Sequence, residues 1–298
     1  MRAGCRVLPW ALVVGACAHA PDGPLFFDDF HQADLATLQR DGWRVRERAG
    51  HPGVEGASWG PAGIELGETD GERVMRLVAR TDGTPQGTQQ AQLCHERKVL
   101  RGTYAARVRF SDAPVEGPNG DVVVQTFYAV SPLRFDFDPE YSEIDWEYLP
   151  NGGWGDTRRR LYAVSWQTVR LSPWQAHNAP TEGFASYAGW RELVMQVSAH
   201  EVRWFVDGQP FATHGGRNVP AVPMAIQFNQ WFSPGALNAG VGPRRVWQQE
   251  VDWVFHVPGR LLSPAEVRAQ VQRLRSAGTA RVDTVPPAEP PLPSTCDF

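Results

Sequence analysis

Three carboxylic acids at alternate positions are the residues of this chain best suited to chemistry. Glu143, Asp145 and Glu147 alternate with large apolar residues over the segment 142–148. A period of two indicates a β-strand, on which the acids share one face and the apolar residues enter a core from the other. On a helix, Asp145 would turn away from the two glutamates. The pattern therefore predicts a strand with an acidic face.

Carboxylates on one face of a strand repel one another, so we expect their pKa values to separate. If one stays ionised while another keeps its proton, the pair can attack a glycosidic bond and protonate its leaving oxygen, as retaining glycoside hydrolysis requires. Positions i and i+4 of a flat strand lie about 13 Å apart at Cα. Retaining enzymes hold their carboxyl groups about 5–5.5 Å apart. Two glutamates that lean together on a concave strand, with the aspartate between them, could close this gap, so the geometry permits the mechanism.

Strands are also predicted for the rest of the main part of the chain. Alternating or continuous apolar segments run from about residue 25 to 258, separated by clusters of Gly, Pro, Asn and Asp. The segment 202–213 predicts a hairpin, because Asp207-Gly208 at its centre suits a type I′ turn. The fold class is therefore all-β, with one globular domain over residues 25–258.

The two ends of the chain differ from this domain. Residues 259–298 hold a predicted helix, capped by Ser263 and ending near Ser276, and then a proline-rich tail. Residues 1–16 have the layout of a signal peptide, and the small residues before Cys17 resemble a bacterial lipobox. This predicts an exported cell-envelope lipoprotein, attached to the membrane by a lipid on Cys17 after a short linker, 17–24. Ordinary secretion is the alternative.

Composition excludes some partners. The 298 residues are 42% hydrophobic and 21% charged, as in a globular protein, and the 33 acidic residues outnumber the 29 basic ones. Nucleic acid is not an expected partner, because no basic excess is left for phosphates. We expect a monomer. Export to an oxidising compartment suggests a disulfide between Cys94 and Cys296, the two cysteines outside the signal and lipidation site.

The acidic segment resembles the E-I-D-x-E catalytic strand of glycoside hydrolase family 16. Segments 102–110, 204–208, 229–231 and 250–254 occur in that family's order and approximate spacing, so the resemblance covers about residues 25–258. It implies a two-sheet antiparallel β-sandwich, a jelly roll of the concanavalin A type. It also implies a lichenase- or laminarinase-like retaining hydrolase that cuts β-linked polysaccharide internally, with a β-glucan as the expected substrate.

The resemblance also implies roles for individual residues. Glu143 is the nucleophile, Asp145 tunes it, and Glu147 is the general acid and base. The substrate-binding candidates are Trp231 and Asn229, which match cleft positions of the family, and Phe127, Trp166, Trp154 and Gln92. For Phe127, Trp166 and Trp154, a packing role is the alternative. No cofactor is required, but Asp252 resembles a ligand of a structural calcium, with a surface aspartate as the alternative.

Two other functions stay open at this point. The same scaffold could serve as a non-catalytic module that binds glycans or attaches to the envelope, since a fold does not fix a function. The same covalent intermediate could also be passed to a sugar instead of water, which would make the protein a transglycosylase.

Overall fold

The computed structural model describes residues 23–238, 242–293 and 296 of the chain. The predicted signal peptide and the predicted lipidation site, Cys17, lie outside these residues. Within them, no helix has the length and apolar character needed to cross a membrane. Most of the regular structure is antiparallel strand, which confirms the all-β prediction.

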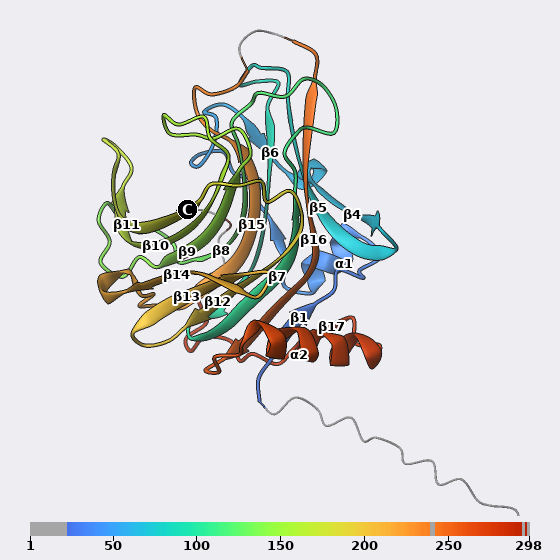
Figure 1. Cartoon of the computed structure of the whole chain (residues 1–298), viewed down its shortest axis with the longest axis vertical. Helices are drawn as coiled ribbons and strands as arrows, with labels where there is room; N and C mark the ends of the chain where they lie inside the picture. The colour runs from blue at the N-terminus through green and yellow to red at the C-terminus, as the bar shows by residue number, and fades with distance from the viewer. Residues whose placement is uncertain (1–22, 239–241, 294–295, 297–298) are drawn as a thin grey trace, which may run out of the picture.

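Two sheets pack face to face around a large hydrophobic core (Figure 1). The sheet that carries the three acids, called the β9 sheet, consists in spatial order of β2 (Arg44–Val45), β6 (Gln89–Val99), β15 (Met224–Phe232), β8 (Val123–Val130), β9 (Glu143–Leu149), β10 (Arg160–Arg170) and β11 (Gln175–Gly183). Figure 1 shows β8, β9, β10 and β11 curving in the same direction, so this sheet is bent.

The second sheet, called the β16 sheet, consists in spatial order of β4 (Ile64–Thr69), β5 (Glu72–Thr81), β16 (Arg245–Pro258), β7 (Gly102–Phe110), β12 (Gly189–Val197), β13 (Glu201–Val206) and β14 (Gln209–Gly215). Beside the second half of β16 lie β1 (Phe26–Asp28) and β17 (Arg281–Asp283). At one end of β6, β5 and the short parallel strand β3 (Ser58–Trp59) join the two sheets. The predicted two-sheet antiparallel sandwich is confirmed.

The predicted hairpin is β13 and β14. Asp207 and Gly208 at its turn have φ values of 50° and 82°. Both angles are positive, as a type I′ turn requires, because its twist matches that of the strands it joins.

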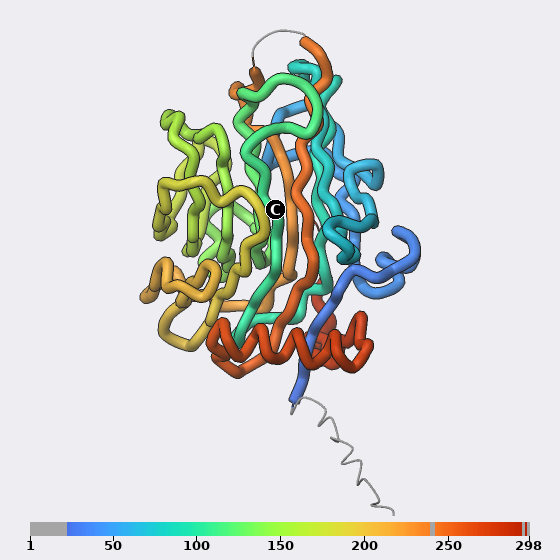
Figure 2. The backbone as a smooth tube through the Cα atoms, turned by 45° about the vertical axis from the view of Figure 1, so that its right-hand side comes forward, coloured from blue at the N-terminus to red at the C-terminus, as the bar shows by residue number. Residues whose placement is uncertain are grey.

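The predicted C-terminal helix is α2 (Pro264–Ser276), which begins with a complete capping box between Ser263 and Glu266. Figure 2 shows that α2 crosses the lower end of the sandwich next to β1. Its buried residues Val267, Val271 and Leu274 pack on the outer face of the β16 sheet. The segment after residue 258 is therefore part of the same packed body.

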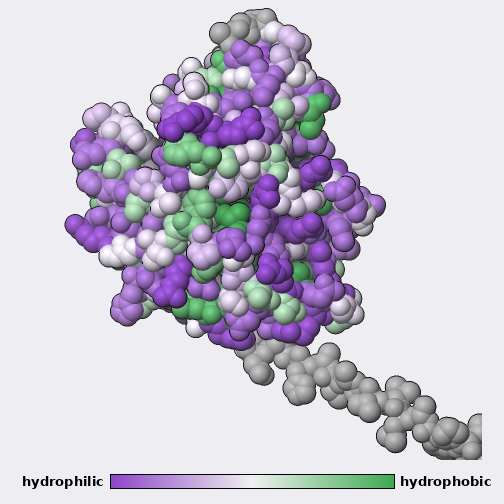
Figure 3. Space-filling model, viewed as in Figure 1, coloured by the Kyte–Doolittle hydropathy of each residue, from purple (hydrophilic) through white to green (hydrophobic). Residues whose placement is uncertain are grey.

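Three further helical turns are short: α1 (Leu35–Arg40), η1 (Pro61–Gly63) and η2 (Gly216–Asn218). On the face of the molecule that Figure 3 shows, hydrophilic residues predominate and apolar ones form scattered patches. This is the ordinary surface of a protein whose large apolar residues fill its core.

Candidate active site

The central strand β9 gives the three acids their common face. Its apolar residues Ile144, Trp146 and Tyr148 are fully buried in the core between the sheets. Trp146 packs edge-on against Trp204 of β13, with 5.1 Å between ring centroids. Since successive strand residues point to opposite faces, the acids project away from this core. The alternation predicted from the sequence is therefore confirmed.

The acids line a cleft of about 570 Å³. Its size is in the usual range of ligand sites. Much of its wall is aromatic, with contributions from Trp154, Tyr162, Trp166, Trp174 and Trp231. Flat apolar rings beside a few polar groups are suited to the faces and hydroxyl groups of sugars.

Glu143 is nearly inaccessible, with 6% of its surface exposed. The hydroxyl of Tyr141 donates a hydrogen bond to its Oε2. Burial raises the pKa of Glu143 to about 7, against the opposing effects of hydrogen bonds from Tyr141 and Asp145. Near neutral pH this carboxyl is therefore able to ionise while two donors hold it in place.

Asp145 lies between the two glutamates on β9 and interacts with both. Burial, followed by the charges of Glu143 and Glu147, raises the pKa of Asp145 well above its usual range. Two carboxyl groups can share a hydrogen bond only if one carries a proton, so a protonated Asp145 is the donor to Glu143. Trp166 fixes the aspartate from the other side, because its Nε1 donates to Oδ2 over 2.6 Å.

Glu147 is the most accessible of the three acids. Burial and the charge of Glu143 raise the pKa of Glu147 to about 8. Its carboxyl forms no hydrogen bond with another residue of the described part of the chain. It is therefore protonated near neutral pH and open to a bound molecule, while Glu143 accepts hydrogen bonds that favour its ionised form.

Five of the six predicted substrate-binding residues line the cleft: Trp231, Asn229, Trp166, Trp154 and Gln92. Trp154 is 55% exposed at the rim, whereas Trp231 is 7% exposed in the wall. Asn229 belongs to the floor, where its Nδ2 donates to the hydroxyl of Tyr128 over 3.1 Å. Their contact with sugar stays a prediction.

Phe127 is the exception, and its predicted contact with substrate is wrong. It is fully buried in the core and stacked on Phe228, with 5.2 Å between ring centroids. Its neighbours Thr126 and Tyr128 line the cleft instead. Successive residues of β8 point in turn to the core and to the cleft, so a prediction that is wrong by one residue places a core residue in the cleft.

Gln92 reaches the cleft, but other protein groups already hold its amide. Its Nε2 donates to Oε1 of Gln227 and to the carbonyl of Cys296, both over 2.6 Å. Its Oε1 accepts from Arg46 over 3.0 Å. Both amide hydrogens are thus engaged, and Gln92 serves mainly to tie the floor of the cleft together.

Several residues of the site escaped the sequence analysis, among them Tyr128, Tyr141, Tyr162, Trp174 and Asn178. Tyr141 lies two positions before Glu143, so extending the alternation back by one step would have found it. Trp174 and Asn178 line the cleft from the β10–β11 hairpin. No local motif marks those two, because only the pairing of β10 with β9 brings the hairpin to the acids.

The surroundings of Asp252 do not fit the predicted calcium site. Asp252 lies on β16, fully buried, and both of its oxygens are bonded to arginine: Oδ2 to Arg107 and Oδ1 to Arg275, each over 2.5 Å. Calcium takes six to eight oxygen ligands, and two guanidinium groups already neutralise this carboxylate. Among the described residues, no group of three or more His, Cys, Asp or Glu is arranged to hold a metal ion.

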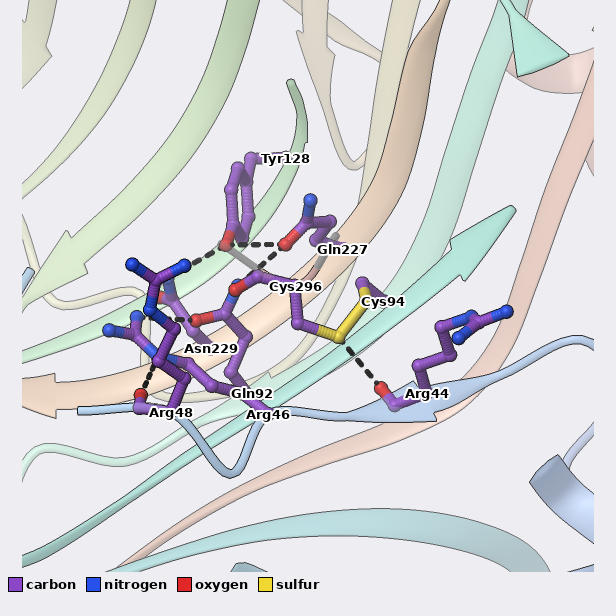
Figure 4. The surroundings of a disulfide bond; sticks show 9 residues. All are labelled: Arg44, Arg46, Arg48, Gln92, Cys94, Tyr128, Gln227, Asn229 and Cys296. Carbon is purple, nitrogen blue, oxygen red and sulfur yellow. Dashed lines mark hydrogen bonds between the residues drawn. A yellow bond between two sulfur atoms is a disulfide. The ribbon is translucent and has the colours of Figure 1, made fainter. Parts of the chain in front are cut away.

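The predicted disulfide between Cys94 and Cys296 is confirmed, with 5.4 Å between the Cα atoms (Figure 4). It joins β6 to the C-terminal tail. The two residues are 202 positions apart in sequence, so the bond closes a very large loop of the chain.

Comparison with known proteins identifies the fold. No family model matches the chain, and no curated protein sequence does. Among the solved structures that share its fold is the β-glucanase of Bacillus licheniformis, which is 16% identical over 79% of this chain and 99% of that chain, with a TM-score of 0.56. Another is a family 16 enzyme from the mixed-linkage glucan locus of Bacteroides ovatus, in complex with G4G4G3G product, which is 14% identical over 78% of this chain and 99% of that chain, with a TM-score of 0.60. A third is the κ-carrageenase of Pseudoalteromonas carrageenovora, in complex with an oligotetrasaccharide of κ-carrageenan, which is 14% identical over 82% of this chain and 98% of that chain, with a TM-score of 0.51. The chain has the jelly-roll fold of glycoside hydrolase family 16.

Proposed function

We propose that this protein is a retaining glycoside hydrolase that cleaves β-linked polysaccharide. Glu143 is the nucleophile, Glu147 the general acid and base, and Asp145 the group that holds and tunes Glu143. The observation that carries the proposal is the arrangement of the buried acids in one aromatic cleft: Glu143 accepts hydrogen bonds that favour its ionised form, whereas Glu147 is open to a bound molecule. Burial raises the pKa of both glutamates toward neutral pH, so one can be ionised while the other keeps its proton.

In the first step, the Glu143 carboxylate attacks the anomeric carbon and the bond to the leaving oxygen breaks. Glu147 gives its proton to that oxygen, and the sugar is left as an ester of Glu143. In the second step, Glu147 takes a proton from water, which attacks the same carbon and breaks the ester. Two inversions at one carbon retain its configuration.

The change in charge between the steps explains how Glu147 changes role. The charge of Glu143 is one cause of the raised pKa of Glu147. When Glu143 becomes an ester this charge disappears, so the pKa of Glu147 falls and its carboxylate becomes available as a base. The two glutamates thus form a coupled pair in which each step prepares the next.

A β-glucan is the proposed substrate. Support comes from the aromatic cleft and from the shared fold with β-glucanases. The κ-carrageenase has the same fold, so sulfated galactans belong in the test beside β-glucans.

The test compares the mature wild-type protein with its Glu143→Gln variant on β-1,3-, β-1,4- and mixed-linkage glucans, xyloglucan, agarose and carrageenan. New reducing ends are expected from wild type alone, with NMR showing that the β-anomer appears first. Release of the α-anomer first, before mutarotation, would contradict the mechanism. Binding without cleavage would favour a glycan-binding module, and longer products with an added sugar acceptor would favour a transglycosylase.

We also propose that the protein is exported and anchored by a lipid on Cys17. The disulfide supports export, because such bonds persist in oxidising compartments. Labelled fatty acid should enter the wild-type protein and leave a Cys17→Ser variant unlabelled. Equal labelling of both proteins would exclude Cys17 as the lipidated residue.

A further inference from the structure

One row of paired residues across the β9 sheet contains both an acid of the cleft and a cysteine of the disulfide. Asp145 on β9 lies opposite Tyr128 on β8, Tyr128 lies opposite Gln227 on β15, and Gln227 lies opposite Cys94 on β6. Residues directly opposite one another on antiparallel strands point to the same face. The side chain of Cys94 therefore points to the cleft face, in the same row as Asp145 and three strands away. Three spacings between strands amount to about 14 Å.

Cys296, from the C-terminal tail, covers this position. Cys94 is fully buried although it points to the cleft face, and Cys296, its disulfide partner, is only 7% exposed. The carbonyl of Cys296 accepts a hydrogen bond from Gln92, which lines the cleft (Figure 4). The tail is thus bound to the floor of the cleft by a covalent bond and a buried hydrogen bond.

The loop 46–52 lies next to Cys296 and Gln92 at the same end of the cleft. Arg46, with 3% of its surface exposed, donates to Oε1 of Gln92 and to the carbonyls of Gly50 and His51. The loop is thereby folded around one guanidinium group. His51 lines the cleft and approaches Trp174 of the β10–β11 hairpin, with 5.6 Å between ring centroids. One flank of the cleft is therefore bordered continuously from β6 to β11.

None of the described residues covers the opposite end of the cleft in this way. Within the described part of the chain β11 pairs only with β10, so it is an edge strand there. Every residue of β11 is at least partly exposed. Asn178, Pro180 and Glu182 of this strand line the cleft. A sugar chain that lies across the strands can leave past β11, whereas at β6 it reaches Gln92, which is bonded to the carbonyl of Cys296.

We propose that the disulfide-bound tail and the loop 46–52 close the β6 end of the cleft, so that a polysaccharide enters from the β11 side with one chain end seated near Gln92. This inference rests on the proposed hydrolase function. It adds that the enzyme cleaves near an end of the polysaccharide chain. About 14 Å between β9 and β6 leaves room for only a short run of sugars. Products of small and uniform length follow, in place of the internal cleavage expected from the sequence.

The test uses the polysaccharide that wild type cleaves best. Wild type should release short oligosaccharides from the earliest times, with little loss of viscosity per new reducing end. A Cys94→Ser/Cys296→Ser variant, in which the tail is no longer bound, should lower viscosity several-fold more per reducing end and give longer products. A second variant, Cys94→Ser without residues 288–298, removes the tail but keeps Val285, which packs in the core.

Thermal unfolding and circular dichroism identify which of the two variants is folded, and the folded one decides. A broad product ladder with rapid loss of viscosity from wild type would overturn the closed end. So would an unchanged product pattern in a folded variant without the bound tail. A wild type that cleaves no polysaccharide would overturn the hydrolase itself, and the chain-end inference with it.

Discussion

The two sheets bury carboxylates in opposite ways. On the β16 sheet, Asp252 and Glu250 are bonded to arginines, Asp252 to Arg107 and Arg275, and Glu250 to Arg76 and Arg109. On the β9 sheet, the three acids of the cleft form no ion pair with any described residue. Glu143 and Asp145 are held instead by a tyrosine, a tryptophan and each other.

The pKa values follow this difference. Burial alone would raise the pKa of Glu250, but hydrogen bonds from Arg76, Thr69 and Arg109 bring it below its ordinary value. For Glu143 and Glu147, burial prevails and raises both values. Paired carboxylates therefore stabilise the sandwich, whereas the unpaired ones reduce its stability and keep the protons that chemistry needs.

Exchanging one glutamate on each sheet should give the largest contrast. Glu147→Gln removes the proton donor and should lower activity about 10²–10⁴-fold at neutral pH, with no loss of thermal stability, because the folded protein no longer has to keep a buried carboxyl protonated. Glu250→Gln should keep activity but lower the free energy of unfolding by about 1–3 kcal/mol, since it weakens bonds to two arginines. Kinetics and denaturant unfolding of both variants measure this. An inactive Glu250→Gln variant with a normal fold would remove the distinction.

The arginine pairs of Asp252 should matter for stability alone. Asp252→Asn removes the buried carboxylate that Arg107 and Arg275 share, while Arg275 keeps its bond to Asp29, and should cost about 3 kcal/mol of unfolding free energy. Glu65→Gln, which alters an exposed pair with Arg80, is the control and should change it by less than about 1 kcal/mol. Added calcium should not raise the melting temperature of wild type. A large calcium-dependent rise would show that the cation displaces the arginines.

The pH profile of kcat/KM should report the cleft acids. Glu143 must be ionised, so activity should rise as pH increases toward about 7; Glu147 must be protonated, so activity should fall above about 8. The two limbs belong to the coupled pair. Stability should also fall as pH rises from about 4.5 to 8, because the folded protein holds protons that the unfolded chain releases. A profile that is flat from pH 5 to 9 would contradict the raised values.

Tyr141 should have the smallest effect. Tyr141→Phe removes a hydrogen bond that lowers the pKa of Glu143, so the acid limb should move to higher pH by about one pH unit, equivalent to about 1.4 kcal/mol. Tyr187→Phe, on a residue packed against the core away from the cleft, is the control. A uniform loss of activity at every pH, without movement of the limb, would give Tyr141 a structural role only.

The sequence correctly predicted those elements whose conformation depends on neighbouring residues. Alternation identified β9, Asp207-Gly208 identified the β13–β14 turn, and Ser263 with Glu266 identified the start of α2. Each depends on backbone geometry over a few neighbouring residues. Phe127 was misplaced because the face of β8 that meets the cleft depends on its register with β9, to which the sequence of β8 gives no local guide.

The sequence by itself determined that three acids share one face of a strand, since side chains alternate on any strand regardless of what packs around it. Tertiary structure alone decided their burial, and hence their raised pKa values, because desolvation depends on every element that excludes water from the cleft. It also placed Arg275 of α2 on Asp252 and Cys296 on Cys94 of β6. Those contacts join residues 23 and 202 positions apart, a separation over which no sequence periodicity acts.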